Sequence, residues 1–166
     1  DAPFCVHNAV AGPLGKHDMC GIAGFSGPDV AAATARPQLE RMIRTLAHRG
    51  PDGYGFHAED GIGLAHARLS IIDLATGDQP IHNERRDVWT VFNGEIFNYV
   101  ELRRELEAQG HRFYTQSDTE VIVHLVDSLY DGDLFEALKG AVAQLHGAYA
   151  IAAFSKDEPH RVVGAR

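Results

Sequence analysis

Four features that lie far apart in the sequence carry groups able to bind an amino acid and attack its side-chain amide: Cys20, Arg68, Asn93-Gly94-Glu95 and Asp118. A cysteine thiolate is a nucleophile, and an arginine guanidinium forks onto a carboxylate. An aspartate carboxylate can hold an α-ammonium group. An asparagine amide and a backbone N–H at a tight turn can hold a developing oxyanion. Together these groups predict a site that binds both ends of a free amino acid.

Cys20 directly follows Met19 and opens a short apolar run punctuated by glycines, which predicts a buried strand with the thiol at its first position. If translation begins at Met19, removal of the methionine leaves Cys20 as the first residue. A terminal cysteine carries a base, its own α-amine, on the same residue as its nucleophile. The reference pKa of such an amine, about 7.7–8.0, lets it accept a proton near neutral pH.

Each of these residues also has a purely structural interpretation. Cys20 could be a small buried side chain at a strand edge, and Arg68 could be an ordinary surface arginine. Asn93-Gly94 is a common turn dipeptide, and the pattern predicts that a strand over residues 88–92 ends there in a sharp turn. Asp118 lies at a predicted helix start, where an acid favours the helix dipole. The joint occurrence of these residues favours the chemical interpretation.

Composition and charge exclude several classes of partner. The 166 residues are enough for one domain with a core. A net charge of −8 provides no basic footprint for nucleic acid or anionic lipid, and the apolar runs are too short to span a membrane. Two cysteines, Cys5 and Cys20, make neither a disulfide framework nor a zinc pattern, so we expect a reduced, cytoplasmic protein. The spacings of His66, His124 and His146 match no metal site either, which predicts that no metal is bound.

The hydrophobic pattern predicts strands first, then consecutive helices, then strands again. Strands are predicted at residues 21–26, 54–58, 61–66, 88–92, 147–155 and 161–165, and helices at about 37–47, at 99–109, from Ser117 and from Asp133. Pro37 suits the first turn of its helix, and Ser117 with Glu120 has the spacing of a capping box. This order favours sheets with helices on their outer faces over a strict alternation of strand and helix.

Both ends of the sequence fall outside this pattern. Residues 1–18 show neither a helical nor a strand period, and they lack the features of a signal peptide. We therefore expect them to lie outside the domain, as a tag, a propeptide or a misplaced start, with residues 19–166 forming the domain. Because the sequence stops within the strand predicted at 161–165, we expect that domain to be incomplete at its C-terminal end.

Five motifs occur in order along residues 19–125. They are Met19-Cys20-Gly21-Ile22, His48-Arg49-Gly50-Pro51-Asp52, Ala67-Arg68-Leu69-Ser70-Ile71-Ile72-Asp73, Asn93-Gly94-Glu95-Ile96-Phe97-Asn98 and Ser117-Asp118-Thr119-Glu120. This stretch resembles class II glutamine amidotransferase domains, most of all the glutaminase domain of glutamine-dependent asparagine synthetases. Residues 126–166 instead resemble the glutaminase domain of glucosamine-6-phosphate synthase. Both are N-terminal-nucleophile hydrolases, so the resemblance implies an α+β fold, the αββα sandwich.

The resemblance implies a role for each matching residue. Cys20 is the nucleophile, and its freed α-amine is the general base. Arg68 binds the α-carboxylate of glutamine, and the side chain of Asn93 with the backbone N–H of Gly94 forms the oxyanion hole. The other implied positions are the backbone groups of Leu69, Ser70, Ile71 and Ile72, which line the same pocket, and the acids Glu95 and Asp118, which hold the substrate ammonium.

The implied reaction is hydrolysis of L-glutamine to glutamate and ammonia through a γ-glutamyl thioester on Cys20. The glutaminase domain needs no cofactor, and ATP and Mg²⁺ are expected only for a synthetase domain. A synthetase or isomerase domain is the expected acceptor of the ammonia, and a homo-oligomer is compatible with this function. Because a peptide bond to Met19 removes the amine base, we expect Met19 to be the functional start or residues 1–19 to be removed.

Three alternatives remain open at this point. The domain could be a glucosamine-6-phosphate synthase-type glutaminase, which shares the chemistry but has a different acceptor. It could be a catalytically silent amidotransferase-like module that binds a partner. It could also be a related N-terminal-nucleophile hydrolase acting on another amide, although Arg68 with Asp118 argues against this because the pair selects a free amino acid.

Overall fold

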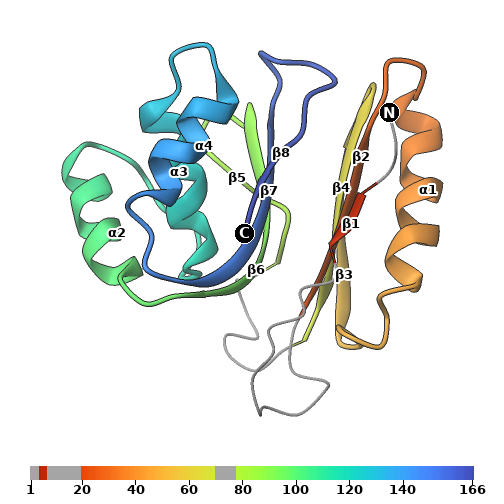
Figure 1. The fold of residues 1–166 in the computed structure, drawn as a ribbon, viewed down its shortest axis with the longest axis horizontal. Coiled ribbons are helices and arrows are strands. Elements are labelled where there is room, and N and C mark those ends of the chain that lie inside the picture. The colour runs from red at the N-terminus through yellow and green to blue at the C-terminus, as the bar shows by residue number, and fades with distance from the viewer. Residues whose placement is uncertain (1–3, 7–19, 70–77) are drawn as a thin grey trace.

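The computed structural model describes residues 4–6, 20–69 and 78–166. In this part of the chain, two four-stranded antiparallel sheets face each other (Figure 1). The first sheet has the order β1-β2-β4-β3, formed by β1 (Phe4–Val6), β2 (Gly21–Ser26), β4 (Ile62–Arg68) and β3 (Gly53–Glu59). The second has the order β5-β6-β7-β8, formed by β5 (Ile81–His82), β6 (Val88–Ile96), β7 (Gly147–Ser155) and β8 (Val163–Ala165).

Helices cover the outer faces of both sheets (Figure 1). Helix α1 (Ala32–Arg44) packs on the first sheet. Helices α2 (Tyr99–Ala108), α3 (Thr119–Leu129) and α4 (Leu134–Val142) form the layer beyond the second sheet and share its core. This arrangement of helix, sheet, sheet and helix confirms the predicted α+β class and the αββα sandwich.

Alternation along the strands decides which side chains face the opposite sheet. Ile22, Leu64 and Val91 pack together between the two sheets, whereas neighbouring positions on the same strands pack against the helices. Because side chains on a strand alternate between its faces, Arg68 shares the inner face with Leu64, and Asn93 shares it with Val91. Two of the predicted site residues are therefore positioned by the same pattern that builds the core.

Helix α1 begins before the proline that was predicted to start it. The helix runs from Ala32, and Pro37 lies inside it. The backbone N–H of Ala32 donates to Oδ1 of Asp60 at 2.8 Å, so a residue from the turn between β3 and β4 caps this end of the helix. The predicted start at residue 37 is wrong because the cap comes from a distant part of the chain.

Strand β6 continues past the point where a turn was predicted. Asn93, Gly94 and Glu95 pair with residues 148–150 of β7. Gly94 has a φ of 149°, and a Cβ there would lie 2.2 Å from the carbonyl oxygen of Ala148. The predicted sharp turn at Asn93-Gly94 is wrong, because pairing with a strand far along the chain extends β6 through it.

Glu120 does not close the predicted capping box with Ser117. Its carboxylate accepts hydrogen bonds from the N–H groups of Tyr114 and Thr115, each at 2.7 Å, and from the hydroxyl of Thr115 at 2.5 Å. The Oγ of Ser117 accepts from the N–H of Thr119 at 3.2 Å. The capping-box prediction is wrong, since buried Glu120 instead satisfies the loop before α3.

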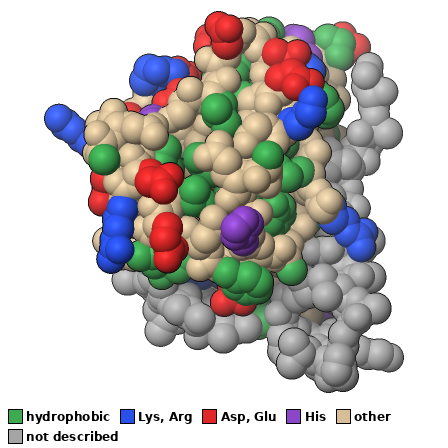
Figure 2. Space-filling model, turned by 60° about the vertical axis from the view of Figure 1, so that its left-hand side comes forward, with side chains coloured by type: hydrophobic (Ala, Val, Ile, Leu, Met, Phe, Trp, Pro, Cys, Tyr) green, Lys and Arg blue, Asp and Glu red, His purple; other side chains and the backbone are tan. Residues whose placement is uncertain are grey.

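Two short strands, β1 and β5, were not predicted, because two or three residues are too few to show a period. Strand β1 pairs with β2 along residues 22–24, although it comes from the segment 1–18 that we expected to lie outside the domain. Among the described residues, no helix combines the length and apolar character needed to cross a membrane. Figure 2 shows acidic and basic side chains interspersed on the helical face rather than gathered by sign.

Candidate active site

Cys20 lies immediately before β2, at the end of the first sheet where β4 finishes. The register pairs Gly21 with Ala67, so the residue that follows β4 comes beside Cys20. The Sγ of Cys20 accepts a hydrogen bond from the backbone N–H of Leu69 at 3.4 Å. Arg49 donates from Nε to the carbonyl oxygen of Cys20 at 3.3 Å. The cysteine is therefore fixed by groups from two other segments.

The turn that carries Arg49 fits closely against the end of β4. A Cβ on Gly50 would lie 2.3 Å from the carbonyl carbon and oxygen of Ala67, so no larger residue fits without a shift of the backbone. The motif at residues 48–52 thus supports the position of Cys20 through a close approach of two backbones.

Burial raises the pKa of the Cys20 thiol above its ordinary value. The N–H of Leu69 and the positive charges of Arg68 and Arg49 act in the opposite direction without outweighing burial. Little thiolate therefore forms near neutral pH unless a base takes the proton.

In the chain that begins at Asp1, alkylation of Cys20 by iodoacetamide should reach half its maximal rate at a higher pH in the folded protein than in denaturant. The sign follows because burial disfavours the charged thiolate, which is the reactive form. Mass spectrometry of peptides measures Cys20 separately from Cys5. Arg68→Gln should raise the pH of half-maximal alkylation further, since it removes a positive charge that favours the thiolate. A folded-state midpoint at or below the denatured one would contradict this interpretation.

Arg68, the last residue of β4, binds a carboxylate in this structure. Its Nη1 donates to Oδ1 of Asp78 at 2.8 Å. The Arg68 side chain is 15% exposed and that of Asp78 is 91% exposed, so a solvated carboxylate lies on a largely buried guanidinium. Arg68 can therefore bind a carboxylate group close to Cys20, whose thiol its charge stabilises as the thiolate.

Asn93 holds a buried hydrogen-bond donor without a partner. The residue is 3% exposed, and its Nδ2 contacts no acceptor among the described residues. An unpaired buried donor costs roughly 1–3 kcal/mol, so its presence calls for an explanation. The exposed backbone of Gly94 comes next on the same strand. A buried amide donor beside an accessible N–H is an arrangement that can bind an oxyanion.

Asp118 joins the start of α3 to the end of β6. Its Oδ2 accepts a hydrogen bond from the N–H of Ile96 at 3.1 Å. Burial raises the pKa of the Asp118 carboxyl above its ordinary value, against the N–H groups of Ile96 and Thr119, and the negative charge of Glu95 raises it further. An ammonium group bound by Asp118 and Glu95 would relieve this repulsion and favour the charged carboxylate.

Two residues that sequence reasoning did not assign to the site contact Phe92, the residue before Asn93 on β6. His66 is buried and hydrogen-bonds to the backbone of Phe92, and burial with the charge of Arg68 lowers its pKa to about 4, so the ring is neutral. Gln79 accepts from the N–H of Phe92 at 2.6 Å and donates to Oγ1 of Thr119 at 3.2 Å. A histidine in a strand and a glutamine in a loop carry no local signal of such contacts.

The predicted site residues therefore form two groups, and His66 of β4 links the strand of the first group to Phe92 of β6, the neighbour of Asn93. The first group is Cys20, Arg68 and Leu69, the second is Asn93, Gly94, Glu95 and Asp118, and Ser70, Ile71 and Ile72 lie outside the described residues.

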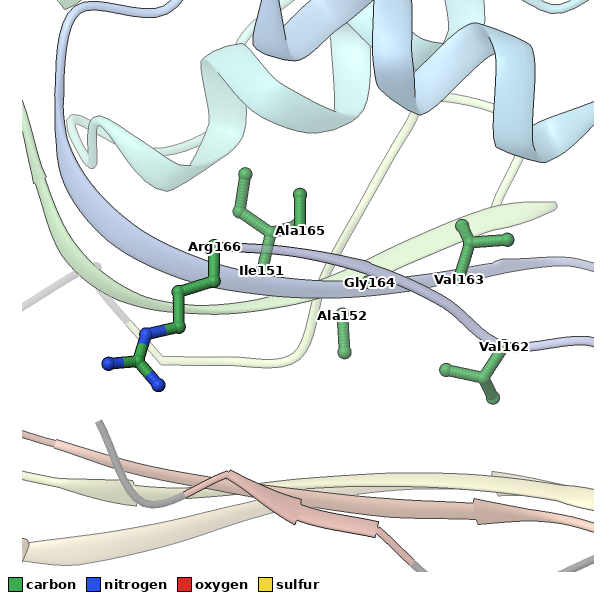
Figure 3. A pocket seen from close by; sticks show the side chains of 7 residues that line it. All are labelled: Ile151, Ala152, Val162, Val163, Gly164, Ala165 and Arg166. Atoms are coloured by element: carbon green, nitrogen blue, oxygen red, sulfur yellow. The ribbon is translucent and has the colours of Figure 1, made fainter. Parts of the chain in front are cut away.

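A separate cavity of about 370 Å³ lies along β7 and β8 (Figure 3). It is lined by Ile151, Ala152 and residues 162–166, and no predicted site residue is among them. Ile151 and Val163 belong to the core under the helices, whereas Ala152 and Val162 turn toward the first sheet. The cavity is therefore a feature of the second sheet and not part of the candidate active site.

Comparison with known proteins connects this geometry to a family. The sequence model of the glutamine amidotransferase domain matches residues 19–166. The chain belongs to this family. The resemblance drawn from the motifs is thereby confirmed, and the glutamine amidotransferase domain includes the segment 126–166 as well as the motif-rich part.

Curated relatives of this amidotransferase domain include two kinds of enzyme. Asparagine synthetase [glutamine-hydrolyzing] 1 of Bacillus subtilis is 38% identical over 150 residues, which cover 89% of this chain and 22% of the relative. Glutamine–fructose-6-phosphate aminotransferase [isomerizing] of Bordetella pertussis is 40% identical over 181 aligned residues, which cover 89% of this chain and 29% of the relative. The chain thus spans less than a third of the length of either protein.

Solved structures support the fold. A glutamine phosphoribosylpyrophosphate amidotransferase from B. subtilis, in complex with ADP and GMP, superposes with a TM-score of 0.61 at 24% identity, covering 82% of this chain and 35% of that one. An allosteric regulatory enzyme of purine biosynthesis gives a TM-score of 0.62 at 22% identity, covering 83% and 35%. At this identity the likeness shows the sandwich shared with the amidotransferase domain, and the roles of single residues stay predictions.

Proposed function

We propose that this amidotransferase domain hydrolyses free L-glutamine to glutamate and ammonia through a thioester on Cys20. The observation that carries the proposal is the position of the Cys20 thiol beside Arg68, whose guanidinium already binds a carboxylate. With this arrangement, the arginine can bind the α-carboxylate of an amino acid while the nucleophile attacks the side-chain amide of the same molecule. The unpaired amide of Asn93 adds a donor for the charge that develops during attack.

The reaction follows from these groups. The α-amine of Cys20 takes the thiol proton, and the thiolate attacks the carboxamide carbon of glutamine. The resulting oxyanion accepts hydrogen bonds from Nδ2 of Asn93 and the N–H of Gly94. The tetrahedral intermediate collapses as its nitrogen receives a proton and leaves as ammonia, which creates the γ-glutamyl thioester. Water then hydrolyses the thioester, releasing glutamate and restoring the thiol.

The substrate would lie between the two groups of site residues. Arg68 and backbone groups of residues 69–72 would bind the α-carboxylate, while Glu95 and Asp118 would hold the α-ammonium. The raised pKa of Asp118, caused first by burial and then by the negative charge of Glu95, fits this role, since a bound cation favours the charged carboxylate. These contacts would discriminate against amides that are not free amino acids.

The proposed mechanism needs a free amine on Cys20. A peptide nitrogen is not a base, so we infer that the active form begins at Cys20 after removal of residues 1–19 or by a start at Met19. The raised pKa of the Cys20 thiol supports the need for this amine, because a buried thiol needs an adjacent base to form the thiolate.

For the ammonia we propose an acceptor of the asparagine synthetase type, with ATP and Mg²⁺ needed only by that partner domain. The support is the Bacillus subtilis relative and the motifs in residues 19–125. The second candidate is an isomerase domain of the glucosamine-6-phosphate synthase type, favoured by the Bordetella pertussis relative. We expect a cytoplasmic protein in either case.

The test is an assay of glutamate release from L-glutamine by a form that begins at Cys20. Arg68→Gln should raise KM about 10- to 100-fold, since hydrogen bonds to charged groups contribute about 1.5–3 kcal/mol. Arg41→Gln, which changes an exposed arginine on α1, should leave KM unchanged. If the form releases no glutamate and Cys20 resists a glutamine-like electrophile, the domain is a silent binding module instead.

A further inference from the structure

A second cluster of chemistry-bearing side chains lies away from the active site. Glu84, in the turn between β5 and β6, meets His111, which follows α2, and His124 of α3. The Nδ1 of His111 lies 3.2 Å from Oε1 of Glu84, and the Nδ1 of His124 lies 3.3 Å from Oε2. Three segments that are separate in sequence thus direct one carboxylate and two imidazoles to a common point.

His124 supplies a buried nitrogen without a hydrogen bond. Its side chain is fully buried, and its Nδ1 has no hydrogen-bond partner among the described residues, although Oε2 of Glu84 lies close by. Its other nitrogen, Nε2, lies 3.3 Å from Oε1 of buried Glu120. A proton on Nε2 that is donated to Glu120 leaves a bare lone pair on Nδ1, directed at Glu84.

His111 repeats this arrangement. Its Nε2 lies 2.6 Å from Oγ of Ser128, and its Nδ1 faces Glu84. Histidines that bind metals commonly use one nitrogen for an outer carboxylate or hydroxyl and the other for the ion. Here Glu120 and Ser128 lie at the outer nitrogens. Nδ1 of His124 has no hydrogen-bond partner among the described residues, and Nδ1 of His111 meets Glu84 at hydrogen-bond distance, so both Nδ1 atoms face the same carboxylate.

The distances fit a transition-metal ion. A tetrahedral zinc site with bonds of about 2.0–2.1 Å has edges of about 3.3–3.4 Å between ligand atoms. Nδ1 of His111 lies 3.2 Å from Oε1 of Glu84 and Nδ1 of His124 lies 3.3 Å from Oε2, so each imidazole is about one such edge from an oxygen of this carboxylate. One ligand atom from each of the three residues lies within 4.8 Å of the other two. Without a cation, a lone pair on Nδ1 of His124 would face Oε2 of Glu84 and be repelled by it. Glu84 is 32% exposed, so the point where the ligands converge opens to solvent.

We propose that Glu84, His111 and His124 bind one divalent transition-metal ion of the zinc class, with a fourth position open to water. Two imidazoles and a carboxylate are ligands that Zn²⁺ accepts. The ion would fasten the β5–β6 turn and the segment after α2 to α3. Its role would be to stabilise the helical layer, and it does not depend on the proposed glutaminase reaction.

The experiment uses the full chain with Cys5→Ser and Cys20→Ser, which removes thiols that also bind zinc. Competition with a chromophoric chelator should give one equivalent of bound Zn²⁺, and Zn²⁺ should raise Tm whereas Mg²⁺ should not. Bound Co²⁺ should show the visible absorption of a tetrahedral site. Glu84→Gln and His111→Gln should each weaken Zn²⁺ binding at least about 100-fold, and Ser128→Ala about 10-fold.

His146→Gln is the matched control, because His146 is an exposed histidine outside the cluster and its loss should leave binding unchanged. Circular dichroism checks that each variant folds. If either Glu84→Gln or His111→Gln does not fold, the other variant still tests the site. The proposal would be overturned if the protein bound no stoichiometric Zn²⁺. It would also be overturned if Glu84→Gln and His111→Gln bound Zn²⁺ as tightly as the parent protein. His124 would then bridge the carboxylates of Glu84 and Glu120 without a metal.

Discussion

Replacing Cys20 with alanine, in a form of the domain that begins at this residue, should lower kcat for glutamine hydrolysis by at least about 10⁴-fold. No other group described near Cys20 can form the thioester, since Leu69 offers a backbone amide and Arg68 a guanidinium. The measurement is glutamate release at saturating glutamine, followed by an enzyme-coupled assay.

The Cys20→Ala variant should still bind glutamine, because Arg68 and Asp118 keep their contacts. Isothermal titration of the variant with glutamine therefore separates a lost nucleophile from a lost site. Tm should stay close to that of the parent form, since the hydrogen bonds of the thiol are long: it accepts from the N–H of Leu69 at 3.4 Å and donates to the carbonyl of Leu69 at 3.9 Å. Turnover comparable to the parent would reject Cys20 as the nucleophile.

Replacing Asn93 with alanine should lower kcat about 10²- to 10³-fold, the usual effect of losing one oxyanion donor. Its Nδ2 has no partner among the residues that the structure describes, so the change should cost little stability. Initial rates at several glutamine concentrations measure kcat, and thermal unfolding measures the free energy of unfolding.

Asn83 offers a matched control, because its replacement should change stability and not the rate. It is a buried asparagine whose Oδ1 accepts from the N–H groups of Asp87 and Val88 and whose Nδ2 donates to Asp87. Asn83→Ala should therefore lower the free energy of unfolding by about 1–3 kcal/mol and leave kcat unchanged. If Asn93→Ala loses stability and keeps its rate, Asn93 is a structural residue.

Local sequence signals predicted the elements that local contacts build. The bounds of β2 and β7 match the predicted strands, and Asp133 caps α4 through the N–H groups of Phe135 and Glu136, as its position suggested. Two of the errors occur where distant residues intervene. Asp60 moves the start of α1, and pairing with β7 carries β6 through Asn93. A single sequence contains no record of such pairings.

The same division applies to the candidate site. Cys20, Arg68 and Asn93 carry groups whose chemistry can be recognised from residue type and motif. Gln79 and His66 act through contacts with the backbone and side chains of other segments, and a glutamine in a loop looks like any other. Candidate site residues could therefore be named from the sequence, and their roles stay predictions, whereas the contacts of His66 and Gln79 could not be predicted.

Gln79 and Asp118 tie the same helix to the same strand at two heights, one at Phe92 and the other at Ile96. Asn93 lies on the strand between them. The separation between Asn93, the proposed oxyanion donor, and Asp118, the proposed ammonium-binding acid, is therefore set by hydrogen-bonded backbone. With these proposed roles, the sheet would fix the side-chain length that the site accepts, and we expect asparagine, shorter than glutamine by one methylene, to be a poor substrate.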